Sequence, residues 1–177
     1  RRQRQMCIRD SKDLPQIKAI ASWIDTHCAD GEIAYMIPHD TLYCPDHFKN
    51  CQLPATPINN KLAFGFSVPG THYFPMQFFE AKYVLTADPF PLTHVNDPEN
   101  EMSHKLNEMF LAVRDEYFAL EETFDMGNGT TFTIWRRTVA PSRAEVEYYL
   151  SAFTEEDAKY PEMFSQVAEN WLAARGL

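Results

Sequence analysis

Long apolar runs are absent from this chain of 177 residues. No segment approaches the 18 consecutive apolar residues typical of a membrane-spanning helix, so the pattern predicts no such helix within the printed residues. Basic residues are also in the minority, with 16 Lys and Arg against 25 Asp and Glu, which gives a formal net charge of −9. A surface of that sign repels phosphate groups. The charge therefore argues against nucleic acid and anionic lipid headgroups as partners.

Loops that cradle phosphates or present a nucleophile are missing as well. Neither G-x-G-x-x-G nor G-x-x-x-x-G-K-[ST] occurs, and no serine stands in a G-x-S-x-G pattern. The segment Gly65-Phe66-Ser67-Val68-Pro69 has only the first of the two glycines that the last pattern needs. We therefore expect no nucleotide cofactor and no serine-hydrolase site.

Cysteine is sparse, with four in the chain. Cys44, His47 and Cys51 form C-x2-H-x3-C, and His39 and Cys28 are the nearest further ligands, but no second compact pair completes a zinc site. We expect Cys28 and Cys51 to pack as small apolar residues and His47 to lie at the surface. The spacing allows a disulfide from Cys28 to Cys44 or from Cys28 to Cys51. Within one helix, Cys44 and Cys51 would lie about 10 Å apart, too far to be joined.

The first eleven residues differ from the rest in composition. Arg1-Arg2-Gln3-Arg4-Gln5-Met6-Cys7-Ile8-Arg9-Asp10-Ser11 carries four of the basic residues of an otherwise acidic chain, and it matches one reading frame of a transposase-based sequencing adapter. We interpret residues 1–11 as a non-native, adapter-derived segment and exclude them from fold reasoning. Residues 12–177 are expected to form a single α/β domain, whose natural N-terminus lies upstream of Lys12.

Apolar periodicity predicts the elements of this domain. Short apolar runs bounded by proline or aspartate predict buried strands at 33–37, 62–68 and 83–87. Helical spacing predicts helices at 14–24, 102–117, 142–153 and 162–174, with shorter ones near 46–51 and 75–80. Two further strands, 118–124 and 131–137, flank Gly127 and Gly129 as a hairpin at the sheet edge. Strands separated by helices predict a three-layer α/β fold with a mostly parallel mixed sheet, a C-terminal β-hairpin and two C-terminal helices.

Acidic and imidazole side chains follow two of the predicted strands. Parallel strands end at one edge of a sheet, so His39 and Asp40 after the first strand and Asp88 and His94 after the third could converge there in a deep pocket. Asp88-Pro89 is also an ordinary strand terminator, which is the reading we favour. A soluble α/β enzyme or small-molecule-binding domain with that site is the alternative function. A protein-interaction domain would instead expose a large apolar patch.

Several segments, taken in order, resemble one family over most of residues 12–150. They are residues 17–27, then Gly31-Glu32-Ile33-Ala34-Tyr35-Met36-Ile37, Asn50-Cys51-Gln52-Leu53-Pro54, Ala81-Lys82-Tyr83-Val84-Leu85-Thr86-Ala87-Asp88-Pro89 and Asn128-Gly129-Thr130-Thr131-Phe132-Thr133-Ile134-Trp135-Arg136-Arg137-Thr138. Their order and spacing resemble the soluble C-terminal domain of bacterial polytopic membrane glycosyltransferases of family 39, which are protein-mannosyltransferase-like and of the GT-C class.

The resemblance implies an accessory domain on the extracytoplasmic side of a membrane, following helices upstream of Lys12. Enzymes of that class use a polyprenyl-phosphate sugar as donor and an acidic catalytic residue in an early extracytoplasmic loop, which would also lie upstream. No catalytic residue is carried onto this chain, so the fragment itself is expected to be non-catalytic. The implied partners are the transmembrane portion of the same polypeptide and a lipid-linked sugar or glycan acceptor.

Overall fold

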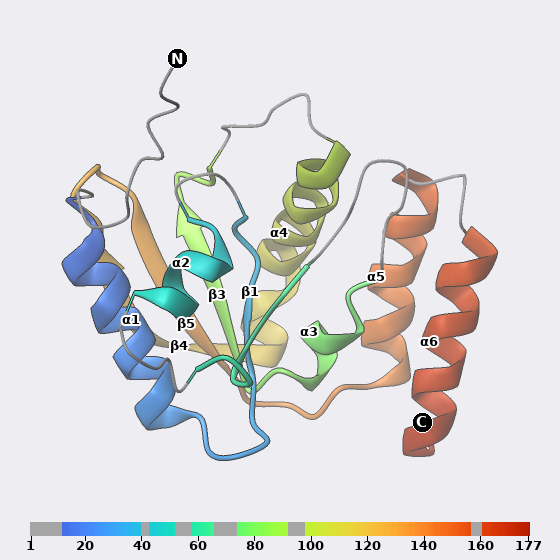
Figure 1. The fold of residues 1–177 in the computed structure, drawn as a ribbon. Helices are drawn as coiled ribbons and strands as arrows, with labels where there is room; N and C mark the ends of the chain where they lie inside the picture. Colours follow the sequence, from blue (N-terminus) through green and yellow to red (C-terminus); the bar gives the residue numbers. More distant parts are fainter. Residues whose placement is uncertain (1–11, 40–42, 52–57, 66–73, 92–97, 157–160) are drawn as a thin grey trace.

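The computed structural model describes residues 12–39, 43–51, 58–65, 74–91, 98–156 and 161–177 (Figure 1). The described strands are β1 (Ala34–Met36), β2 (Leu62–Phe64), β3 (Tyr83–Asp88), β4 (Phe118–Asp125) and β5 (Thr131–Arg137). The described helices are α1 (Leu14–His27), α2 (Pro45–Asn50), α3 (Met76–Glu80), α4 (Pro98–Tyr117), α5 (Arg143–Glu156) and α6 (Pro161–Arg175).

The strands form one five-stranded mixed sheet in the order β2-β1-β3-β5-β4. β1 pairs in parallel with both β2 and β3, with Tyr35 opposite Ala63 on one side and Val84 on the other. β5 then pairs antiparallel with β3 and with β4, which places the hairpin at the sheet edge as predicted. The α/β class is thereby confirmed: the parallel end consists of strands joined through helices, and the antiparallel end is the C-terminal hairpin.

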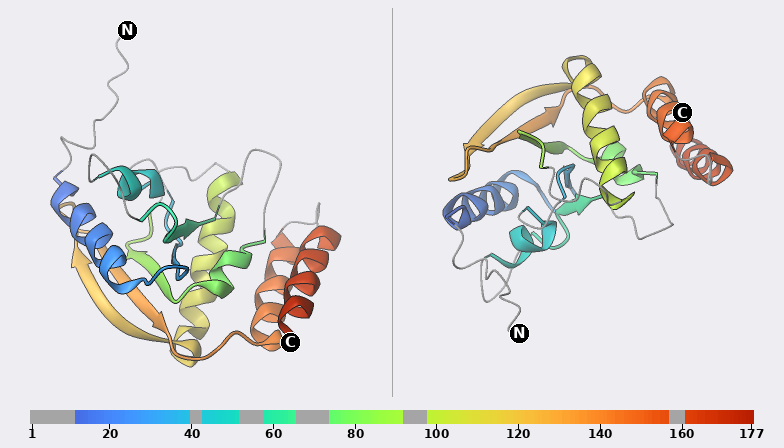
Figure 2. Two further views of the ribbon diagram at one scale, coloured as in Figure 1. Left: turned by 60° about the horizontal axis from the view of Figure 1, so that its bottom comes forward. Right: turned by 90° about the horizontal axis from the view of Figure 1, so that it is seen from above.

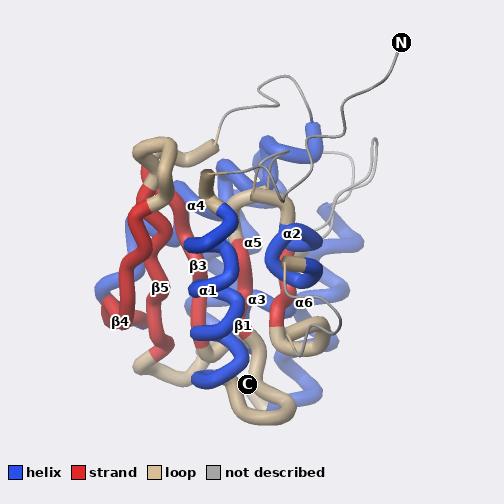
Figure 3. Tube along the Cα trace, turned by 60° about the vertical axis from the view of Figure 1, so that its left-hand side comes forward, coloured by secondary structure: helices blue, strands red, loops and turns tan. Residues whose placement is uncertain are grey.

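Helices cover both faces of the sheet, which makes three layers (Figure 2). Successive residues of β1 and the residue after it alternate between two hydrophobic clusters: Ala34 and Met36 pack with α1 and α2, whereas Tyr35 and Ile37 pack with α3, α4, α5 and α6. Figure 3 shows α1 lying across the first of these faces. Both faces of β1 and β3 are therefore buried, as the continuous apolar runs predicted.

The boundaries of the elements agree closely with the periodicity, with a few differences at the ends. β2 ends at Phe64, and residues 66–68 of the predicted strand lie outside the described residues. α4 begins at Pro98, four residues before the first apolar residue of its stripe. The adapter-like residues 1–11 also lie outside the described part of the chain.

The first turn of α5 shows half of a capping box. Ser142 Oγ accepts the backbone N–H of Glu145 at 3.2 Å, which satisfies one of the free donors of the helix N-terminus. In the full motif the glutamate would reach back toward the capping residue. Here both oxygens of Glu145 instead accept hydrogen bonds from Arg137 at the end of β5. The sequence pattern therefore predicted the start of the helix correctly, but the Glu145 side chain binds Arg137 in place of the N-terminal backbone.

None of the described helices combines the length and the apolar character needed to cross a membrane.

Candidate functional site

The carboxyl ends of the parallel strands lie at one edge of the sheet. The helix that follows β1, α2, packs on one face of the sheet, and the helix that follows β3, α4, packs on the other, so the elements after these two strands diverge from this edge. Such a divergence is where open α/β sheets usually bind ligands. Of the predicted site residues, His39 and Asp88 lie at this edge, whereas Asp40 and His94 lie outside the described residues.

His39 and Asp88 face different neighbours. The His39 ring lies edge-on to the Phe64 ring of β2 at a centroid distance of 5.7 Å. Asp88 is exposed at the end of β3, in register with Thr131 of β5. Within the described residues no hydrogen bond joins these two side chains. Their convergence with Asp40 and His94 in one pocket therefore stays a prediction.

Two of the three described cysteines lie in the core. Cys28 and Cys51 are buried, Cys44 is half-buried, and no disulfide joins any two of these three. Burial raises the pKa of Cys28 to about 11, so this thiol stays protonated at neutral pH and is a poor nucleophile or metal ligand. His27 does not serve Cys28: its Nδ1 lies 2.8 Å from Trp23 O, and its ring stacks on Trp23. The described residues contain no cluster of three or more metal-ligating side chains.

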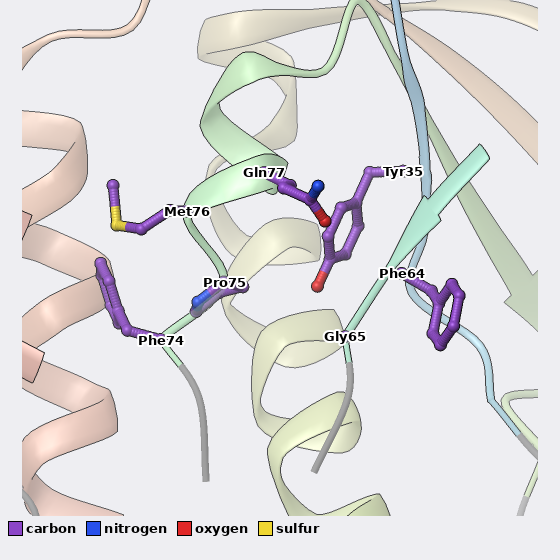
Figure 4. A pocket seen from close by; sticks show the side chains of 7 residues that line it. All are labelled: Tyr35, Phe64, Gly65, Phe74, Pro75, Met76 and Gln77. Atoms are coloured by element: carbon purple, nitrogen blue, oxygen red, sulfur yellow. The ribbon is translucent and has the colours of Figure 1, made fainter. Parts of the chain in front are cut away.

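A cavity of about 270 Å³ lies between β1, β2 and α3 (Figure 4). Tyr35 reaches it from the centre of β1, Phe64 and Gly65 border it at the end of β2, and Pro75 and Gln77 belong to the start of α3 and the residue before it. Phe74 and Met76 complete the described lining. Because β2 runs parallel to β1 and β3, Gly65 lies at the same sheet edge as His39 and Asp88.

The only hydroxyl of the described lining belongs to Tyr35. This residue is 1% exposed, and its hydroxyl has no hydrogen-bond partner. Figure 4 shows the ring extending from β1 so that the hydroxyl ends between Gly65 and Pro75. A Cβ on residue 65 would lie 3.0 Å from this oxygen, so glycine lets the backbone lie beside the hydroxyl without a side chain crowding it. Burial raises the pKa of Tyr35 well above its ordinary value, which keeps the phenol protonated.

Sequence reasoning missed this cavity. Tyr35 stands in a continuous apolar run and was interpreted as an ordinary strand residue. The available signal was Gly65 inside the predicted strand 62–68, since a glycine within a strand often marks a close approach to other atoms. Which atoms approach it depends on the pairing of β1 with β2, which the sequence pattern does not specify.

A second polar cluster is buried where β5 meets α5. The side chains of Arg137 and Glu145 are 8% and 0% exposed, and Arg137 Nη1 lies 3.0 and 2.9 Å from the two carboxylate oxygens. The guanidinium also lies over the Phe118 ring, 4.5 Å from its centroid. Burial raises the pKa of Glu145, and the hydrogen bonds from Arg137 oppose that shift. With its cation enclosed by protein groups, this cluster connects elements and does not present a site to a ligand.

The large apolar side chains that remain exposed are spread over several elements. They include Leu111 on α4, Leu120 on β4, Tyr148 on α5 and Met163 on α6. The single large patch expected of a protein-interaction domain therefore stays a prediction.

No protein-family model matches the chain, and neither the curated proteins nor the solved structures contain a significant match.

Proposed function

We propose that this chain is the accessory extracytoplasmic C-terminal domain of a polytopic membrane glycosyltransferase that transfers a sugar from a polyprenyl-phosphate donor. The observation that supports it most is the position of the resembling segments in the fold. The segments around residues 33–37, 81–89 and 128–138 contain β1, β3 and β5, which are adjacent strands of one sheet. The resemblance therefore concerns a contiguous structural unit and not scattered surface pieces.

In this proposal the domain positions the acceptor or donor for a membrane site supplied by the upstream part of the polypeptide. The acidic balance of the chain fits a domain that stands away from anionic lipid headgroups. The chemistry itself would belong to an acidic residue in the upstream membrane part.

Recovery of the uninterrupted reading frame upstream of Lys12 from the source DNA tests this proposal. We expect several apolar segments of at least about 18 residues and an acidic residue in the loop after the first of them. An upstream frame without such segments contradicts the proposal.

The recovered full-length protein then allows a test of the accessory role. Two sets of membranes are incubated with a labelled polyprenyl-phosphate sugar. One contains the full-length protein, and the other contains a protein that keeps the upstream part and lacks residues 12–177 of this sequence. We expect the truncated enzyme to keep its hydrolysis of the donor and to lose transfer to acceptor. Equal transfer by both proteins contradicts an accessory role.

A further inference from the structure

The cavity between β1, β2 and α3 has the features of a small-molecule site. Its described lining is aromatic or aliphatic except for the Tyr35 hydroxyl and the Gln77 amide, and it contains no charged side chain. We propose that this cavity binds a small, neutral, mostly apolar molecule that carries one hydroxyl or carbonyl group, which hydrogen-bonds to Tyr35 Oη. This proposal is independent of the proposed glycosyltransferase function.

The first argument is the unpaired hydroxyl. Buried polar groups are nearly always hydrogen-bonded, because an unmade bond leaves the cost of desolvation uncompensated. Tyr35 is 1% exposed, its hydroxyl is buried without a hydrogen-bond partner, and its side chain lines the cavity. A bound molecule with one polar atom opposite this oxygen would complete the arrangement.

The second argument is that the space is maintained by the residues around it. The Tyr35 ring is held by an edge-on contact with Phe78 at 5.7 Å, which fixes the direction of the hydroxyl. Phe78 is fully buried on α3, so the ring rests on a packed helix. Gly65 contributes no side chain where any Cβ would lie 3.0 Å from the oxygen. Tyr35 and Gly65 therefore line the cavity together, and a larger residue at position 65 would crowd the hydroxyl.

The third argument concerns the kind of ligand. The volume of about 270 Å³ lies just below the usual range of about 300–1,000 Å³ for ligand pockets, which favours a molecule with a single ring or a short branched chain. Apolar walls favour apolar ligand atoms, while a charged group would lose its hydration without a counterion. A sugar ring, with several hydroxyls, would find only the Tyr35 hydroxyl and the Gln77 amide as polar side-chain partners among the described lining residues.

Tyr149 provides a matched comparison. It is also fully buried, and its hydroxyl also has no hydrogen-bond partner, but it does not line this cavity. Tyr149→Phe therefore removes the same chemical group from the interior without changing the proposed site.

The experiment compares 4-methylphenol with toluene, which has nearly the same shape without the hydroxyl. Each probe is titrated into the protein labelled with ¹³C at its methionine methyl groups, and binding is followed at Met76, whose signal is assigned with Met76→Leu. We expect 4-methylphenol to bind more tightly than toluene. Tyr35→Phe should weaken 4-methylphenol binding about tenfold and change toluene binding less than about twofold. Tyr149→Phe should leave both affinities unchanged.

Gly65→Ala tests the space independently of the hydroxyl. The added methyl group should weaken both probes at least about fivefold, because it occupies the volume in front of Tyr35 Oη. Circular dichroism checks that each variant is folded. Should Gly65→Ala fail to fold, Tyr35→Phe still decides the question.

Three results would overturn the proposal. One is a protein that binds neither probe at millimolar concentration. Another is 4-methylphenol affinity that Tyr35→Phe leaves unchanged or that Tyr149→Phe reduces equally. The third is a crystal structure in which Tyr35 Oη bonds to a water that 4-methylphenol does not displace. Each outcome is separate from the upstream reading frame, so the pocket and the glycosyltransferase proposal can fail independently.

Discussion

At the scale of single residues, Arg137 and Glu145 form an ion pair that is buried in the interior. Two charges removed from water cost several kcal/mol, and their attraction offsets that cost only when both are present and well oriented. Arg137 Nη1 contacts both oxygens of Glu145, whereas Nε and Nη2 have no hydrogen-bond partner. The pair is therefore sensitive to loss of one partner and tolerant of replacement of both.

This reasoning gives a stability prediction for the pair. Glu145→Gln leaves the Arg137 cation buried without its counterion and should lower the free energy of unfolding by about 3–5 kcal/mol. The double variant Arg137→Met with Glu145→Leu should recover most of that loss, because it buries no charge. Urea denaturation followed by circular dichroism measures both.

Arg136→Met is the matched control on the neighbouring residue. Arg136 pairs with Glu121 at 2.8 Å, but the two side chains are 43% and 31% exposed. Its loss should cost less than about 1 kcal/mol. A double variant as unstable as Glu145→Gln alone would show that the ion pair is not the source of the effect.

Local sequence patterns do not reveal contacts between residues that lie far apart in the chain. Asp13 directly precedes α1. Its side chain, however, accepts hydrogen bonds from Gly127 N at 2.6 Å and from the Tyr43 hydroxyl at 3.1 Å. Those partners lie far along the chain, so no local pattern could have indicated them.

At the scale of elements, local signals were sufficient for most of the fold. Apolar runs located β1 and β3 because both of their faces are covered, and the glycines between β4 and β5 located the hairpin, where Gly129 has a φ of +87°. The order of the strands in the sheet could not be predicted from local patterns. It depends on which cluster each helix completes, and the cavity beside Tyr35 follows from that order.

The turns that precede β1 and β3 are joined by a surface ion pair with a predictable pH dependence. Lys82 Nζ lies 3.0 and 2.8 Å from the two oxygens of Glu32, and Ala29 N donates to Glu32 at 2.9 Å. The hydrogen bonds from Lys82 and then Ala29 hold the pKa of Glu32 below its ordinary value. A lowered pKa in the folded state means that the contribution is present above the pKa of the unfolded chain and is lost as the pH falls through the folded pKa.

Glu32→Gln should therefore destabilise the protein at pH 7 by less than about 1 kcal/mol, since both side chains are more than one-third exposed and solvent screens the pair. The difference from the parent protein should shrink as the pH falls from about 7 to about 3. Thermal unfolding at several pH values measures it. A difference that stays constant or grows toward low pH contradicts the role assigned to the pair.

At the scale of the whole molecule, the sheet joins two hydrophobic clusters that share its strands. One cluster contains Ile24 of α1 and the other contains Phe110 of α4, and both residues are fully buried. The strands between them alternate side chains into both clusters, so neither can lose its packing without exposing strand residues that also support the other.

This shared sheet predicts cooperative unfolding. Ile24→Ala should lower the free energy of unfolding by about 2–5 kcal/mol and Phe110→Ala by about 3–5 kcal/mol, because each leaves a cavity in a packed interior.

The three tryptophans allow each face of the sheet to be followed separately. Trp23 packs against the cluster that contains Ile24, and Trp171 belongs to the cluster that contains Phe110. Variants that keep only one of these two, with the remaining tryptophans changed to phenylalanine, report one face each. Each core substitution should shift the urea midpoint equally at both reporters, because the two faces unfold in one transition. A midpoint that moves at one reporter alone would mean that the two faces unfold as separate units.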